Sequence, residues 1–264
     1  MEMIRSRQND KIRLARSLKQ RKKREEEKRF LIEGLFHLGE ALEAKATFDY
    51  VLVAPNLIRN EFGKKLLADF EESDIALFDT DEKILDELSL RETSSGFLGI
   101  GHSQYLMMEN VPIRNSQRLL ALVRPQDPGN VGSILRSIDA FGADGLLLLD
   151  GGVDAYHPAA IRAGMGAHFW KQIIRASFAD FTDWAKKHGV QILGSSAKGG
   201  IELGRVESKS PYVLLMGSER EGLSEDHLAH CQRVIALPMR GRSTSLNLSV
   251  AAGIMLFGLE NQDS

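Results

Sequence analysis

The sequence predicts an α/β protein made of a small α/β domain followed by a larger domain with a parallel sheet. Three observations support this prediction. Short apolar segments alternate with segments of helical periodicity along nearly the whole chain. The alternating units are short before residue 103 and become longer from residue 118. In the later part the apolar runs are continuous, which is typical of strands buried on both faces of a parallel sheet.

Composition indicates a globular protein with a sizeable core. The chain has 264 residues, of which 43% are hydrophobic and 27% charged. Its single cysteine, Cys231, excludes an internal disulfide and is typical of a reducing compartment, so we expect a cytoplasmic protein. No apolar run reaches the roughly 20 residues needed to span a bilayer, and the basic first 30 residues lack the apolar core of a secretory signal.

Charge is distributed unevenly along the chain. Residues 1–30 contain 12 Lys and Arg against 5 Asp and Glu, although the whole chain has a net charge of −2. We therefore interpret residues 1–29 as a basic helical arm that binds a polyanion. The candidate contacts are Arg21, Lys22, Lys23 and Arg24. The alternative is a solvated helix whose cations pair with Glu25, Glu26 and Glu27.

Residues 30–102 predict a small α/β domain, followed by a linker at 103–117. Apolar runs indicate strands at 30–32, 48–54, 75–78 and 96–101. The segments between them indicate helices at 34–44, at about 56–70 with Asn56 as its cap, and at about 81–90 with Asp81 as its cap.

Residues 118–264 predict a doubly wound parallel sheet with helices on both faces. The strands are expected at 119–123, 145–150, 190–194, 212–216 and 234–237. Helices are expected after residue 130, from Pro158 through a segment rich in small residues, at 179–188 and at 225–231. The last ordered stretch, 235–259, begins as a strand, stops at Pro238 and ends as a helix that is apolar nearly all the way round, so we expect this helix to be buried.

Ligands of such sheets bind outside the carboxyl ends of the strands. Three loops that leave strand ends carry polar and glycine residues, at 127–136, 217–222 and 238–249. Each loop alone is also compatible with an ordinary turn or helix cap. The sequence does not contain the usual dinucleotide fingerprint, a phosphate-binding P-loop or a Gly-x-Ser-x-Gly elbow. It also has no His/Cys cluster with metal spacing, so we expect no metal.

Taken together, the three loops resemble the ordered motifs of the SpoU/TrmH-type RNA ribose 2′-O-methyltransferases of the SPOUT superfamily. The motifs are Asp127-Pro-x-Asn130-x-Gly132-x-x-x-Arg136, Gly217-x-Glu219-x-x-Gly222-Leu223 and Pro238-Met239-x-Gly241-x-x-x-Ser245-Leu246-Asn247-x-Ser249. The resemblance covers about residues 119–259. The run from Lys22 to Gly34 and the domain after it are similar to the ribosomal-protein-like RNA-binding extension of the rRNA-modifying members.

The resemblance implies a deep trefoil knot, a homodimer and S-adenosylmethionine bound in the knot. It implies a cofactor site formed by Ser195, Gly217, Leu237, Met239 and Leu246, with the backbone of Leu237 and Met239 near the adenine. It implies a catalytic group formed by Arg136, Asn130, Glu219, Ser245 and Asn247. Arginine is a poor base, so Arg136 is expected to position a phosphate and to stabilise the developing alkoxide.

The first functional hypothesis is therefore a methyltransferase acting on ribosomal RNA, with 23S rRNA as first choice. Transfer RNA is the alternative substrate. A non-catalytic RNA-binding or ribosome-assembly protein with the same fold is the alternative from another class. The intact polar residues of the three motifs favour the enzyme, because a binding protein does not need them.

Overall fold

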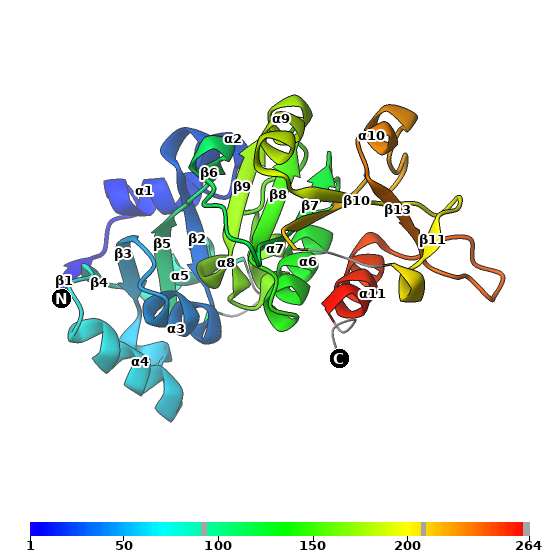
Figure 1. Cartoon of the computed structure of the whole chain (residues 1–264). Helices are drawn as coiled ribbons and strands as arrows, with labels where there is room; N and C mark the ends of the chain where they lie inside the picture. The colour runs from blue at the N-terminus through cyan, green and yellow to red at the C-terminus, as the bar shows by residue number, and fades with distance from the viewer. Residues whose placement is uncertain (91–93, 207–209, 261–264) are drawn as a thin grey trace. The chain divides into compact units, whose positions relative to one another are not determined.

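A computed structural model describes residues 1–90, 94–206 and 210–260, and its helices and strands are drawn in Figure 1. The chain forms two compact units. Unit 1 comprises residues 1–104 and 156–169, and unit 2 comprises 105–155 and the residues from 170 onward. Both units are α/β, as the sequence predicts.

Unit 1 contains a five-stranded mixed sheet in the order β1-β4-β3-β5-β2. Its central pair, β3 and β5, is antiparallel, whereas β1, β4 and β3 run parallel to one another. The strands are β1 (Glu2–Ile4), β2 (Arg29–Glu33), β3 (Phe48–Val53), β4 (Leu77–Thr80) and β5 (Phe97–His102). The sequence analysis located four of them and missed β1, which has only three residues.

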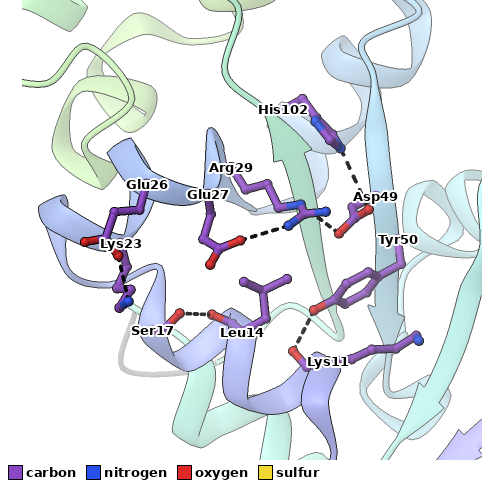
Figure 2. Close-up of polar contacts among 10 residues, drawn as sticks. All are labelled: Lys11, Leu14, Ser17, Lys23, Glu26, Glu27, Arg29, Asp49, Tyr50 and His102. Atoms are coloured by element: carbon purple, nitrogen blue, oxygen red, sulfur yellow. Dashed lines mark hydrogen bonds and ion pairs between the residues drawn. The ribbon is translucent and has the colours of Figure 1, made fainter.

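The expected basic arm is part of unit 1 rather than a separate segment. Its single predicted helix is two helices, α1 (Asp10–Ser17) and α2 (Arg21–Glu27). Ile12 and Leu18 are completely buried in a core shared with strand residues and with α5 (Glu82–Leu88). The Tyr50 hydroxyl donates a 2.6 Å hydrogen bond to the Lys11 carbonyl and ties α1 to the sheet (Figure 2). Apolar burial therefore overrides the charge pattern that suggested an independent arm.

The remaining helices of unit 1 follow the predicted order with one shifted boundary. They are α3 (Leu35–Glu43), a short 3-10 helix at Pro55–Leu57 and α4 (Glu61–Glu71). The cap of α4 is Asn60, not Asn56, and its side chain accepts a 2.7 Å hydrogen bond from the Gly63 N–H. Pro55 starts a separate 3-10 turn, so the main helix begins only after a second capping residue. Asp81 precedes α5 as expected.

Residues 156–169 leave the predicted C-terminal domain and join unit 1. This segment holds α7 (Pro158–Gly164) and most of α8 (Ala167–Trp170). The Tyr156 ring lies 4.6 Å from that of Phe30, centroid to centroid, and its hydroxyl bonds to the backbone of Gln104. Gly166 has a φ of +89°, and a Cβ there would lie 2.7 Å from Cγ of Glu40. The small residues of this segment therefore permit close packing within unit 1.

Unit 2 contains an eight-stranded sheet in the order β11-β13-β10-β12-β7-β8-β9-β6, with every pair parallel. The strands are β6 (Leu106–Met107), β7 (Arg118–Val123), β8 (Gly145–Leu149), β9 (Gln172–Ala176), β10 (Gln191–Ser195), β11 (Ile201–Glu202), β12 (Tyr212–Met216) and β13 (Arg233–Ala236). The expected linker 103–117 is partly structured, because β6 pairs with β9 and a 3-10 helix follows at Met108–Asn110.

Helices cover the sheet of unit 2 as a doubly wound fold requires. One core joins strand residues such as Leu147 and Val213 to Phe181 and Trp184 of α9 (Phe178–His188). Alternate residues of β7 are also fully buried, which places apolar side chains on the second face. The remaining helices are α6 (Pro128–Ala140), α10 (Glu225–Ala229) and α11 (Leu248–Glu260), and α6 packs against α11.

The final helix, α11, differs from its prediction. Its side chains Met255 and Leu256 are buried, but Val250, Ile254 and Phe257 are exposed to 49%, 43% and 55%. One face of this apolar helix is therefore largely exposed in the described part of the chain, although the Phe257 ring contacts the ring of Phe141. None of the described helices has the length and apolarity of a membrane span.

Candidate active site

Three loops at one edge of the unit 2 sheet enclose a cavity of about 410 Å³. The strands before them, β13, β10 and β12, are adjacent and parallel, so their carboxyl ends meet at this edge. The cavity is lined by all five residues proposed for the cofactor, namely Ser195, Gly217, Leu237, Met239 and Leu246. Residues far apart in sequence thus form one concave site of ligand size.

The loop after β12 requires glycine at its first position. A Cβ added to Gly217 would lie 1.9 Å from the carbonyl carbon of Gly222, which no side chain could accommodate. Gly222 itself has a φ of +67° and its N–H donates to the Ser218 carbonyl at 3.0 Å. The two glycines therefore close a tight loop that presents Glu219 beside the cavity.

A chain of hydrogen bonds connects this loop to the first and third motifs. Nδ2 of Asn130 donates to Oε1 of Glu219 at 2.9 Å, and Nδ2 of Asn247 donates to Oδ1 of Asn130 at 3.1 Å. The backbone N–H groups of Gln126 and Asp127 donate to the same Glu219 carboxylate at 3.0 and 3.2 Å. Three of the five predicted catalytic residues are thus in one network.

Glu219 is held in its ionised form. Desolvation by itself raises the pKa of this carboxyl, but the hydrogen bonds from Asn130 and from the backbone outweigh it, so its pKa lies below the ordinary value. A carboxylate that accepts three N–H groups and has a lowered pKa is a weak base. Its chemistry suits holding the two loops together better than removing a proton.

Asn130 of this network lies in the first turn of α6, and the residues before it favour the start of a helix. Asp127 is the N-cap, and its Oδ1 accepts from the N–H groups of Gly129 and Asn130 at 2.6 and 3.3 Å. Pro128 occupies the first turn, where its missing N–H costs nothing. The amino end of α6 therefore delivers Asn130, which is 9% exposed, to Glu219.

The other two predicted catalytic residues lie outside the hydrogen-bond network. Ser245 lines the cavity but makes no side-chain hydrogen bond to the network within the described ranges. Arg136 is exposed on α6 and is not among the residues that line the cavity. Its neighbours Ile134, Leu135 and Ile138 form the buried face of the helix, so Arg136 lies on the opposite side, as the helical periodicity predicts.

The four proposed RNA contacts on α2 differ in environment. Arg24 is only 3% exposed, and its Nη1 donates to the carbonyls of Leu18 and Lys19 at 2.9 and 3.0 Å. It therefore closes the turn between α1 and α2, and its proposal as an RNA contact is wrong. The side chains of Arg21, Lys22 and Lys23 are exposed and form ion pairs with Glu25 or Glu26, including the Lys23–Glu26 pair in Figure 2.

Sequence reasoning missed some residues of the site. The α11 residues Ala251 and Met255 line the cavity, as does Lys198 after β10. Ala251 and Met255 belong to no recognisable motif. Lys198 follows the end of a predicted strand, and this position could have indicated that it lies at the site. Among the described residues, no group of His, Cys, Asp or Glu is arranged to hold a metal ion.

The chain matches the SpoU rRNA Methylase family over residues 117–257 and the MRM3-like substrate binding domain over residues 9–99. The first match covers more than half of the chain and includes the cavity and the network. The chain therefore belongs to the SpoU rRNA methylase family, which confirms the resemblance drawn from its three motifs.

Individual relatives match over nearly their whole length. The 23S rRNA (guanosine(2553)-2′-O)-methyltransferase RlmP of Bacillus subtilis is 27% identical, over 98% of this chain and 99% of its own. The structure of an AdoMet-bound rRNA methyltransferase from Sinorhizobium meliloti is 30% identical and has a TM-score of 0.87, covering 98% of this chain and 97% of that chain. An RNA 2′-O ribose methyltransferase structure is also 30% identical, with a TM-score of 0.83 and coverage of 99% of each chain.

Proposed function

We propose that this protein transfers a methyl group from S-adenosylmethionine to a ribose 2′-hydroxyl of ribosomal RNA, with 23S rRNA as the first choice. The observation that carries the proposal is the cavity at the carboxyl ends of β10, β12 and β13 beside the Asn130–Glu219–Asn247 network. The family match and the full-length relative that is named a 23S rRNA 2′-O-methyltransferase support the reaction and the substrate.

The cavity fits the proposed cofactor in size and chemistry. Its volume of about 410 Å³ is within the range of small-molecule sites. Apolar walls from Leu237, Leu246 and Met255 suit a purine ring. When bound, S-adenosylmethionine supplies an electrophilic methyl group on a sulfonium.

The polar residues of the three motifs then have distinct roles. Arg136 binds a phosphate next to the target ribose and stabilises the negative charge that develops on the 2′-oxygen. Asn130 and Asn247 orient the polar groups around the ribose, and Ser245 adds a hydroxyl at the cavity wall. The proton of the 2′-hydroxyl passes to the phosphate or to water, because Arg136 is always protonated and Glu219 is already occupied by three donors.

We also propose a homodimer, in which Arg136 approaches the cofactor of the other protomer. Two observations support it. Arg136 is exposed outside the cavity of its own chain, and the α11 side chains Val250, Ile254 and Phe257 are exposed. A contiguous exposed apolar face of this kind is typical of an interface between subunits.

The trefoil knot belongs to the same proposal. The segment after β13, the second strand from one end of the sheet, contributes Leu237, Met239 and Leu246 to the cavity and continues into α11. The helix α11 then packs against α6, which follows β7 in the middle of the sheet. This return of the chain to the central helix supports a threaded C-terminal segment.

Unit 1 is proposed to hold the RNA, in line with its match to a substrate-binding domain. Arg21, Lys22 and Lys23 remain candidate contacts, but each has to give up an ion pair to a glutamate before it can neutralise a phosphate. Each is therefore expected to contribute less than an unpaired cation. A ribosomal RNA substrate also agrees with the expected cytoplasmic location.

The test is methyl transfer with purified components. The protein is incubated with methyl-labelled S-adenosylmethionine and either unmodified 23S rRNA or unmodified transfer RNA made in vitro. Label on a ribose oxygen of 23S rRNA is the expected result. Label only on transfer RNA would support the alternative substrate. Tight RNA binding without any transfer would instead favour a non-catalytic assembly protein.

A further inference from the structure

The loops around the cavity mouth are richer in cations than the chain as a whole. The segments 124–130, 195–200, 217–223 and 238–247 lie at the carboxyl edge of the unit 2 sheet and carry five cations and three acids, whereas the whole chain is net negative. The cations are Arg124, Lys198, Arg220, Arg240 and Arg242, and the acids are Asp127, Glu219 and Glu221.

Two of the three acids already accept hydrogen bonds within the fold. Asp127 caps α6 and accepts two backbone N–H groups, and Glu219 accepts two backbone N–H groups and the Asn130 amide. Their charge is therefore partly compensated within the fold. The segments at this edge therefore carry an excess of positive charge.

Arg240 and Arg242 are the two arginines of these segments whose loop carries no acid. Both are exposed, and neither forms an ion pair with a described residue. They flank Gly241, and their loop contributes Met239 and Thr244 to the cavity wall. In Figure 1 this loop is the orange-red segment between β13 and α11.

Arg124 follows β7, the strand next to β12, and so lies at the same edge of the sheet. It has a φ of +46°, a conformation that favours glycine or asparagine.

We propose that Arg240 and Arg242 bind the backbone phosphates of the RNA strand that carries the target ribose. Each guanidinium can hold a phosphate through two N–H groups, and neither has to break an ion pair to do so. This contrasts with Arg21, Lys22 and Lys23, which are paired with glutamates. The inference rests on the proposed function, since it assigns the RNA contact of the same site.

The experiment measures how affinity for unmodified 23S rRNA depends on salt in the full-length protein. For the double variant Arg240→Gln/Arg242→Gln, we expect the slope of log affinity against log salt to decrease by about 1.4, because each phosphate contact on a single strand contributes roughly 0.7. RNA affinity should fall on the order of tenfold. Affinity for S-adenosylmethionine, measured by calorimetry, should stay unchanged.

The matched control is Lys186→Gln/Lys187→Gln. It removes the same charge from two exposed lysines in the last turn of α9, just before β10 begins and so at the opposite edge of the sheet. The control should keep the wild-type slope. A wild-type slope in the arginine double variant would overturn the inference, and so would an equal change in the control. Weaker cofactor binding with an unchanged slope would assign the arginines to the cofactor instead.

Failure of the proposed function has a different signature. If the wild-type protein transfers no methyl group to 23S rRNA, the function is wrong whatever the slope. If the wild type transfers methyl groups and the arginine double variant binds RNA with the wild-type slope, only this inference fails.

Discussion

Asn130 and Glu219, 89 residues apart in sequence, meet through a 2.9 Å hydrogen bond at the edge of the unit 2 sheet. The bond joins the amino end of α6, which carries Arg136, to the loop that lines the cavity. The Glu219 carboxylate therefore ties the start of the helix that carries Arg136 to the wall of the cavity.

This relationship predicts a pH-dependent stability. The pKa of Glu219 is lowered in the folded protein, so its interactions stabilise the fold above the unfolded pKa, and this contribution is lost as pH falls through the folded pKa. Glu219→Gln should therefore be less stable than wild type near neutral pH, with a difference that shrinks in acid. Thermal unfolding at several pH values measures it.

The control is Glu221→Gln, which removes the neighbouring acid of the same loop. Among the described residues, the Glu221 side chain has no hydrogen-bond or ion-pair partner, so its variant should follow the wild-type pH profile. A constant difference between Glu219→Gln and wild type across the acid range would contradict the role given to the Glu219 carboxylate.

Arg24 is expected to stabilise unit 1 rather than to bind RNA. Arg24→Gln removes two charge-assisted hydrogen bonds to buried carbonyls and should lower the free energy of unfolding by about 1.5–3 kcal/mol. Arg21→Gln, at an exposed ion pair, should change it by less than about 1 kcal/mol. Denaturant titration compares the two. If both substitutions changed the free energy of unfolding by the same small amount, Arg24 would not have the structural role given to it.

Arg136 is expected to act on the reaction and not on folding. Arg136→Ala should leave stability and cofactor binding nearly intact, because its side chain is opposite the buried face of α6. Methyl transfer should fall by roughly 10²–10³-fold, the scale for losing one charge-stabilising donor. Arg136→Lys should recover little, since lysine lacks the planar fork.

Single-turnover transfer at saturating RNA and cofactor separates this loss from weaker binding. Arg205→Ala, at an exposed arginine of the same unit, provides the control and should transfer at the wild-type rate. Near wild-type transfer by Arg136→Ala would remove Arg136 from the active site, and loss of activity only through loss of the dimer would make it an interface residue.

The exposed face of α11 predicts a dimer that depends on Ile254. Wild type should sediment as a dimer at micromolar concentration, and Ile254→Asp should shift it to a monomer because the charge would be buried in the interface. Phe62→Asp, at an equally exposed apolar residue of unit 1, should leave the dimer intact. A monomeric wild type would contradict the proposed homodimer.

Much of the fold follows from local sequence patterns. Continuous apolar runs predicted β7, β8, β10 and β12, because each crosses a sheet that is buried on both faces. The strands that were not predicted are short or contain both polar and apolar residues. For example, β6 has two residues, and β9 contains Gln172 and Arg175 beside two isoleucines. Their pairing depends on neighbours in space, which periodicity does not report.

The sequence motifs predicted which residues lie together at the cavity. They did not predict features that depend on tertiary packing, such as which side chains are buried. All five proposed cofactor residues line one cavity, since glycines and strand ends have local signatures. The burial of Arg24 depends on the turn between two helices that the sequence suggested was one. The exposure of Phe257 depends on what covers α11, and an apolar helix has the same sequence pattern whether a domain or a subunit covers it.

The most direct measurement of the central claim is a map of ribose 2′-O-methylation across all ribosomal and transfer RNA, from cells with and without this protein. The account predicts that one position in 23S rRNA loses its methyl group without the protein. That position should regain it with the wild-type protein and not with Arg136→Ala. Unchanged methylation of every ribosomal RNA position, or a loss confined to transfer RNA, would contradict the account.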